Sequence, residues 1–215
     1  MVRVLAISDE VVESLWQPTV RSLEPDLVVA CGDLPFDYLD YLVSTLNVPM
    51  AYVPGNHDPD VSGRRSRAGL SLEAGLPADE TGPPGAVNVD GRIADVAGLR
   101  VAGLGGSIRY REGPNQYTER QQRGRARRLA VRARLRRLRD HRPVDLLLTH
   151  SPPAGVGDGE DAPHRGFACL HDLTGALRPR FLLHGHVHPY GREAPDRRLG
   201  ETRVCNVVGH RMLQV

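Results

Sequence analysis

The sequence predicts an α/β fold, because apolar runs of strand length alternate with helical segments and end abruptly in polar residues. The clearest run, Met50-Ala51-Tyr52-Val53, is followed directly by Pro54-Gly55-Asn56-His57-Asp58. This pattern is typical of a buried strand that opens into a tight loop. Open α/β sheets bind ligands at the carboxyl ends of their strands, so the loop is the first candidate site. Taken alone, a turn that uses Gly, Asn and Asp for their backbone freedom explains it equally well.

Composition is that of an ordinary globular protein, with 25% charged and 40% hydrophobic residues among 215. We expect residues 1–215 to form a single domain. The net charge of +2 gives no argument for a membrane or nucleic-acid partner, although all 28 basic residues are Arg. The three Cys lack framework spacing, and neither a signal peptide nor a membrane-spanning run is recognisable. These features favour a reduced, cytoplasmic location.

In the first half of the chain, three predicted strands each deliver polar residues. The strands are Val2–Ile7 before Ser8-Asp9-Glu10, Leu27–Cys31 before Gly32-Asp33, and the run that ends at Val53. A helix is expected over residues 13–23 despite Pro18, and another begins at Pro35 with apolar residues at helical spacing. Residues 59–85 give no clear element, and three short runs at 86–89, 92–96 and 100–104 predict antiparallel strands.

In the second half, a loop over residues 105–117 precedes an Arg-rich helix from Thr118 to about Arg139. Val131, Leu135 and Leu138 make one narrow apolar stripe on that helix. A strand over 144–148 then delivers Thr149-His150. A loop over 151–167, a helix over 168–177 and a strand over 181–183 lead to His184-Gly185-His186-Val187-His188. Strands near 202–208 and 211–215 complete the prediction.

Five predicted strands therefore each end in a residue able to bind a metal. These residues are Asp9, Asp33, Asn56, His150, and the pair His186 and His188. Because the carboxyl ends of neighbouring parallel strands converge, the side chains are expected to share one cleft. A mixed set of nitrogen and oxygen ligands suits Mn, Fe or Zn better than Ca.

Taken together and in this order, the segments Asp9, Gly32-Asp33, Gly55-Asn56-His57-Asp58, Thr149-His150 and Gly185-His186-Val187-His188 resemble the calcineurin-like metallophosphoesterases. The resemblance spans nearly the whole chain. It implies a four-layer αββα sandwich, in which two mixed β-sheets are flanked by helices and hold two metal ions at their carboxyl edge. Small prokaryotic phosphodiesterase-like members are the most similar in size and motif.

The resemblance also implies roles for individual residues. Asp33 would bridge the two metals, with Asp9 and His188 completing the first site. Asn56, His150 and His186 would complete the second. His57 would stabilise the phosphoryl charge and protonate the leaving oxygen. Two divalent ions, with Mn preferred over Fe or Zn, would clamp the phosphoryl oxygens and acidify a water for in-line attack. A phosphodiester, such as a nucleotide or nucleic-acid diester, is favoured over a monoester.

Two positions depart from the family pattern. Val11 occupies the place of a first-site His ligand, which predicts weak occupancy of that site unless Glu10 compensates. Phe36 occupies the place of an Asp that orients the catalytic His, and either Asp37 or Asp58 is the alternative. The first departure leaves open a catalytically silent metal-binding scaffold of the same fold, although the intact His57 argues against it.

Four further residues in the loops are candidates for substrate binding: Arg109 and Arg111 in one loop, and His164 and Arg165 in the other. His184 is expected to be a core residue rather than a ligand. The Arg-rich helix over residues 118–139 raises the alternative of a nuclease or nucleic-acid binder. A solvated helix surface is favoured, because the net charge is modest and no aromatic residues interleave with the arginines.

Overall fold

The computed structural model of the chain describes residues 1–60, 72–73, 76–77, 82–189, 191 and 194–215. Most of the segment 59–85, for which the sequence predicts no element, lies outside these residues. Within it, β4 (Leu72–Glu73) and β5 (Leu76–Pro77) form a short antiparallel pair. In the described part of the chain, no helix is both long and apolar enough to cross a bilayer.

The first large sheet has five strands in the order β15-β1-β2-β3-β6. They are β1 (Arg3–Ser8), β2 (Leu27–Ala30), β3 (Met50–Tyr52), β6 (Ala86–Asn88) and β15 (Gly209–Gln214). Strands β1, β2, β3 and β6 are parallel, and β15 runs antiparallel to β1. The two chain ends lie side by side at this pairing, where the Val2 N–H donates to Val215 O at 2.9 Å.

The second large sheet has six strands in the order β13-β14-β12-β11-β8-β7. They are β7 (Ile93–Val96), β8 (Leu99–Leu104), β11 (Leu146–Thr149), β12 (Phe181–His184), β13 (Arg197–Leu199) and β14 (Thr202–Asn206). The four inner strands are parallel, and both edge strands are antiparallel to their neighbours. A separate parallel pair, β9 (Ser107–Ile108) and β10 (Gln116–Tyr117), lies within the loop 105–117.

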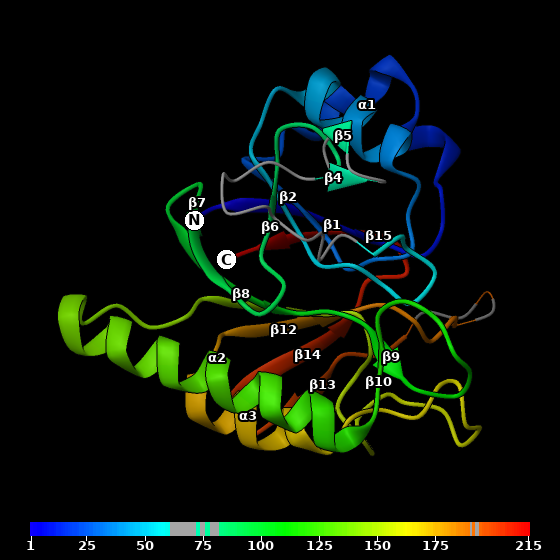
Figure 1. Cartoon of the computed structure of the whole chain (residues 1–215). Helices are drawn as coiled ribbons and strands as arrows, with labels where there is room; N and C mark the ends of the chain where they lie inside the picture. The colour runs from blue at the N-terminus through cyan, green and yellow to red at the C-terminus, as the bar shows by residue number, and fades with distance from the viewer. Residues whose placement is uncertain (61–71, 74–75, 78–81, 190, 192–193) are drawn as a thin grey trace.

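The two sheets face each other, with helices on both outer sides, as predicted (Figure 1). Alternate residues of each strand serve different layers, since side chains of a strand point to opposite faces. In β1, Val4 and Ala6 pack between the sheets, whereas Leu5 and Ile7 pack beneath α1 (Phe36–Leu46). Across the second sheet, Leu147 packs beneath α2 (Glu119–Asp140) and α3 (Cys169–Leu177).

The prediction of a single helix over residues 13–23 is wrong. Two short 3₁₀ helices, η1 (Glu13–Leu15) and η2 (Pro18–Leu23), stand there instead. Gln17 between them is extended, at φ −130° and ψ 151°, because the ring of Pro18 disfavours the α conformation for the preceding residue. The break shortens both helices but leaves Leu15 and Val20 buried under the first sheet.

The prediction of three antiparallel strands over residues 86–104 holds for β7 and β8 but not for β6, which pairs parallel with β3. The chain leaves the first sheet at Val89, whose N–H donates to Tyr52 O at 2.9 Å. It enters the second sheet at Gly91, whose N–H donates to Gly103 O at 2.9 Å. The turn at Asp90-Gly91 therefore connects two sheets rather than two strands of one hairpin.

Helix α2 begins as the sequence predicts. The Thr118 hydroxyl accepts from the Gln121 N–H at 3.3 Å, and the Gln121 side chain accepts from the Thr118 N–H at 2.8 Å. This capping box satisfies two backbone donors of the first turn. The residues that face the domain are Gln122, Ala126 and Leu129, so the apolar stripe of this helix lies on its solvent side.

Candidate metal centre

The residues that follow five strands meet at the carboxyl edge of the two sheets. They are Asp9, Asp33 and Asn56 after β1, β2 and β3 of the first sheet, and His150 and His186 after β11 and β12 of the second. Two hydrogen bonds join the sheets at this point. The His186 N–H donates to Asp9 Oδ2 at 2.9 Å, and His150 Nδ1 lies 2.7 Å from Cys31 O. The convergence predicted from the sequence is thus present.

Four of these residues form a group with the geometry of a metal site. Asp9, Asp33, His150 and His186 each offer one ligand atom, and these atoms all lie within 4.8 Å of one another. His150 Nε2 is 3.3 Å from Asp33 Oδ2 and 3.0 Å from Asn56 Oδ1. The Asp9 and Asp33 side chains are only 5% and 9% exposed, and no arginine among the described residues pairs with either. Two buried carboxylates paired with imidazoles rather than with arginine fit a divalent cation, and the donor set suits a transition metal.

Asp9, Asp33 and His150 shift one another's pKa values. Burial lowers the pKa of His150, but the charges of Asp33 and Asp9 outweigh this effect and raise its pKa to about 9. Burial raises the pKa of Asp9, which the charge of His150 opposes. For Asp33, the charge and hydrogen bond of His150 overcome burial and lower its pKa. A proton on His150 therefore supplies positive charge that a metal ion would also supply, and the two compete for Nε2.

Asp58 fixes the backbone of the β3 loop. Its Oδ2 accepts from the N–H groups of Gly55 at 2.7 Å and Asp33 at 2.9 Å. These bonds run to backbone donors, and the role of Asp58 in orienting the His57 ring stays a prediction. Asp37, the other alternative, accepts from the Tyr38 N–H at the start of α1. The residue beside the His57 ring is Arg111, whose Nη2 lies 3.4 Å from His57 Nδ1.

Three residues of the group have a left-handed backbone conformation. Asp9, Asp33 and His186 have φ values of 61°, 57° and 68°, which L-residues adopt at a cost. Two glycines make room for the carboxylates. A Cβ on Gly55 would collide with the Asp33 side chain, and a Cβ on Gly185 would collide with Ser8 and Asp9. Strained residues held by close packing are typical of preorganised functional sites.

Comparison with known proteins decides the family. A family model described as calcineurin-like phosphoesterase matches residues 5–190 of the chain. The chain belongs to the calcineurin-like phosphoesterases. Members of this family are hydrolases of phosphoesters that use divalent metals, so the ligand group has a family counterpart. No curated protein sequence matches the chain.

Solved structures agree with this calcineurin-like fold. The crystal structure of TT1561 of Thermus thermophilus is similar with a TM-score of 0.62 and 18% identity, over 97% of this chain and 89% of that one. Another crystal structure is similar with a TM-score of 0.60 and 18% identity, over 99% and 98% of the two chains. At this identity the likeness shows the fold alone.

The residues expected at a first metal site depart from the family pattern at Val11, as the sequence indicates. Val11 is 39% exposed and offers no ligand atom. His188, the expected first-site ligand, lies with Nε2 3.9 Å from Asp9 Oδ1 and Nδ1 2.9 Å from Glu10 Oε1. Glu10 therefore contacts the site through His188.

The four residues predicted to bind substrate differ in where their side chains lie. Arg111 lies beside His57, whereas Arg109 turns toward α2 and donates to Gln116 O and Gln121 Oε1, both at 3.3 Å. The His164 ring lies 5.4 Å from the His186 ring. Arg165 is exposed and makes no contact with the ligand group among the described residues. Arg111 and His164 thus lie beside predicted site residues, whereas the Arg109 side chain is directed to α2.

Three contacts at the calcineurin-like site are not predicted from the sequence. The Tyr110 hydroxyl lies 3.3 Å from Asn56 Nδ2, the Ser8 hydroxyl donates to Asp9 Oδ2 at 2.5 Å, and Pro163 O lies 2.7 Å from His186 Nε2. With Nε2 engaged by Pro163, His186 keeps Nδ1 for a ligand role. Ser8 directly precedes Asp9, a signal available in the sequence, but the other two contacts depend on loop conformation. His184 is buried as expected, and burial lowers its pKa to about 4.

Proposed function

We propose that the chain is a metal-dependent phosphodiesterase whose catalytic domain comprises residues 1–215. The observation that carries the proposal is the four-residue group Asp9, Asp33, His150 and His186, with ligand atoms within 4.8 Å, beside the exposed His57. Membership of the calcineurin-like phosphoesterases supports phosphoester hydrolysis as the reaction class. The finer choice of a diester rests on the charge beside His57.

Metal binding is assigned to residues on both sheets. Asp33 has a ligand atom within 4.8 Å of those of Asp9, His150 and His186 and is proposed to be shared by two divalent ions. Asp9 and His188 would hold one ion, and Asn56, His150 and His186 would hold the other. When bound, such ions neutralise phosphoryl charge and acidify a water molecule at neutral pH. We propose Mn²⁺ as the first ion to test, because the mixed imidazole and carboxylate set accepts it.

His57 and Arg111 are proposed to act on the leaving group. Arginine has no acceptor atom, so its 3.4 Å contact with His57 Nδ1 is a hydrogen bond only when Nδ1 accepts. That arrangement leaves the proton of a neutral imidazole on Nε2. As the ester P–O bond breaks, the Nε2–H can hydrogen-bond to the departing oxygen and pass its proton to it, while the proton lost by the water that adds to phosphorus returns the imidazole to its neutral form. The guanidinium beside it is placed to offset phosphoryl charge.

The preference for a diester follows from charge. A diester carries one negative charge and a monoester near neutral pH carries about two. Arg111 is the arginine that contacts the candidate acid His57 among the described residues. Arg111 is exposed, and its one positive charge balances the single negative charge of a diester, which carries a substituent on each side of the phosphate. Nucleotide diesters are the leading substrate class in this proposal.

The test is hydrolysis of bis-p-nitrophenyl phosphate and of p-nitrophenyl phosphate by protein loaded with Mn²⁺, beside an Asp33→Asn variant. The proposal expects diester turnover that is faster than monoester turnover and is lost in the variant. Faster monoester turnover would overturn the diester assignment alone. No turnover of either ester with Mn²⁺, Fe²⁺, Co²⁺ or Zn²⁺ would favour a silent scaffold, for which Val11 is the motivating residue.

A further inference from the structure

The solvent side of α2 carries an apolar stripe that nothing in the described chain covers. Val131, Leu135 and Leu138 are 57%, 63% and 67% exposed. Their spacing of i, i+4 and i+7 places them on one face, opposite the buried Gln122, Ala126 and Leu129. A helix that already buries another face has no structural need for three large aliphatic residues in water.

Arginines without partners surround this stripe. Four arginines of α2 are bound within the domain: Arg123 to Glu119, Arg125 to Asp90, Arg132 to Gly91 O and Arg136 to Asp95. The others have no hydrogen-bonding or ionic partner among the described residues. They are Arg120, Arg127, Arg128, Arg134, Arg137 and Arg139. By helical spacing, Arg128 and Arg139 flank one side of the stripe, and Arg127 and Arg134 flank the other.

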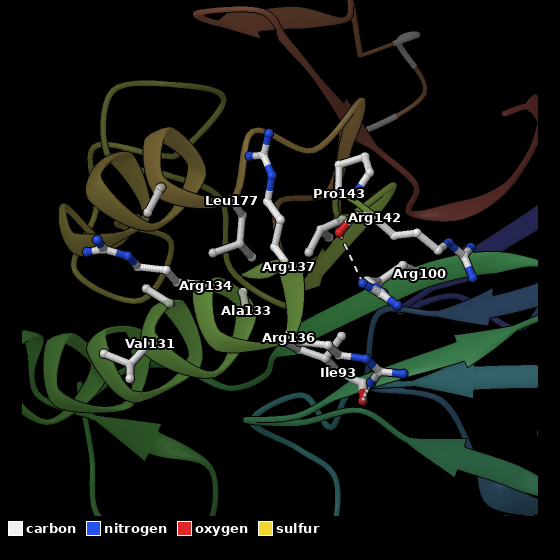
Figure 2. A pocket seen from close by; sticks show the side chains of 13 residues that line it. Ile93, Arg100, Val131, Ala133, Arg134, Arg136, Arg137, Arg142, Pro143 and Leu177 are labelled. Carbon is white, nitrogen blue, oxygen red and sulfur yellow. Dashed lines mark hydrogen bonds between the residues drawn. The ribbon is translucent and has the colours of Figure 1, made fainter. Parts of the chain in front are cut away.

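A pocket of about 410 Å³ opens beside the stripe, between the C-terminal half of α2, the end of α3 and the β7–β8 edge. Its apolar wall includes Ile93, Ala133 and Leu177. In Figure 2, Arg137 extends from α2 along this pocket between Leu177 and Pro143. Arg134 and Val131 also line it, so the pocket is continuous with the stripe. We call the pocket, the three stripe residues, Arg134 and Arg137 the α2 docking surface.

The chemistry of this surface favours one occupant. A second copy of the same face would bring two clusters of unpaired arginines together, which like-charge repulsion opposes. Nucleic acid matches the charge, but the surface offers no aromatic side chain for base stacking and places aliphatic groups at its centre. A lipid bilayer would touch the convex helix without filling the pocket beside it. An acidic helix with an apolar face matches charge, stripe and pocket together.

We propose that the α2 docking surface binds an acidic amphipathic helical segment of a partner protein. The apolar face of that segment lies along Val131, Leu135 and Leu138, and one large apolar side chain enters the pocket. Its Asp and Glu residues pair with the arginines, principally Arg134 and Arg137. The surface is formed by the side of α2 and the end of α3, apart from the strand ends that hold the metal ligands, so this function is separate from catalysis.

The test uses a fluorescein-labelled synthetic 20-residue helical peptide with Leu at i, i+3, i+4 and i+7 and Glu at most other positions. The affinity of this peptide for the protein of residues 1–215 is measured by fluorescence anisotropy. It is compared with the affinities of two matched peptides, one with Lys in place of Glu and one with Ser in place of Leu. Only the peptide with both Glu and Leu is expected to bind, and its affinity should fall at higher salt. Equal binding of the Lys or the Ser peptide would overturn the proposal.

Variants locate the binding. The double variant Arg134→Glu with Arg137→Glu should lower the affinity for the peptide by about 10-fold or more, since charge reversal replaces attraction with repulsion. Leu135→Ser with Leu138→Ser should weaken it comparably. Arg197→Glu with Arg198→Glu makes the same change in net charge on exposed residues of β13, at the opposite edge of the second sheet, and should have a much smaller effect. Circular dichroism checks that each variant folds.

Equal loss in the two charge-reversal pairs would reduce the interaction to nonspecific charge and overturn the assignment. Vesicles containing anionic phospholipid and a DNA duplex form the remaining arms. Stripe-dependent binding to either, with none to the peptide, would replace the protein partner by that surface and also overturn the proposal.

Discussion

Nε2 of His150, at the end of β11, lies 3.3 Å from Oδ2 of Asp33, which follows β2 in the opposite sheet. This pair brings both sheets to one point, and Asp9 and His186 complete a ligand group around it. The architecture therefore places residues from distant parts of the sequence within reach of one cation. The account of function depends on that placement, and each prediction below tests one part of it.

His57→Gln is expected to lower kcat for the diester by about 10²–10⁴-fold, the usual contribution of a general acid. Mn²⁺ binding, measured by calorimetry, should be unchanged, because the proposed ligands are other residues. Arg111→Gln should give a smaller loss, with Arg109→Gln in the same loop as its matched control. Equal losses in the two arginine variants would contradict a role for Arg111 beside His57.

Val11→His is expected to tighten metal binding, because an imidazole at this position restores the ligand that the family pattern has there. We expect the dissociation constant of the weaker Mn²⁺ site to fall by about 10-fold or more, the scale seen when ligand shells change. Isothermal titration calorimetry measures this constant directly. Val11→Gln, a polar change without an imidazole, is the control. An equal gain in Mn²⁺ affinity in this variant would contradict a ligand role for the introduced imidazole.

Gly185→Ala is expected to lower both stability and metal affinity. The added methyl group would meet Ser8 and Asp9, so a proposed ligand must move. A loss of about 1–3 kcal/mol in the free energy of unfolding is expected from overpacking. Gly175→Ala in α3 is the control, since a Cβ there meets nothing within 4 Å. Urea unfolding and Mn²⁺ titration of both variants compare them; equal effects would contradict the steric argument.

The acid sensitivity of the fold is expected to involve Arg100, whose side chain is 3% exposed and pairs with Asp95 at 3.0 Å and Asp140 at 2.6 Å. Hydrogen bonds from Arg100 lower the pKa of both carboxyl groups. The unfolded chain thus binds more protons in acid. Their stabilisation is complete above the unfolded pKa, near 4, and disappears as the pH falls through the lower folded values.

Arg100→Met should therefore lower the free energy of unfolding at pH 7 by about 1–3 kcal/mol. The difference from the unchanged protein should shrink by pH 3. Urea unfolding at the two pH values measures it. A difference that is the same at pH 3 and pH 7 would show that lost packing, rather than the ion pairs, explains the effect.

The ligand positions were predictable because each stands immediately after a strongly apolar strand. Asp9, Asp33 and His150 need only the strand pattern and the rule that parallel strands end together. The role of Asp58 was not predictable, since it depends on how the loop directs the N–H groups of Gly55 and Asp33 toward one carboxylate oxygen. Sequence spacing does not encode that direction.

The position of β6 and the exposure of the α2 stripe were also beyond the sequence. Local alternation predicts a strand at Ala86 but not which of two sheets it joins. In α2, Leu135 belongs to the stripe that periodicity identifies, yet the face toward the domain includes Gln122. The Gln122 side chain donates to Gly105 O at 3.0 Å, so a buried polar contact rather than the largest apolar residues helps set the orientation of the helix.

The most direct test of the central claim is the stoichiometry of Mn²⁺ binding, measured by isothermal titration calorimetry on metal-free protein and on Asp33→Asn. Glu201→Gln serves as the control, because it makes the same kind of change at an exposed residue that belongs to no proposed ligand set. The account predicts two ions per chain, one weaker than the other, with both lost or greatly weakened in Asp33→Asn. Absence of binding, or binding that Asp33→Asn leaves unchanged, would contradict a metal centre built on Asp33.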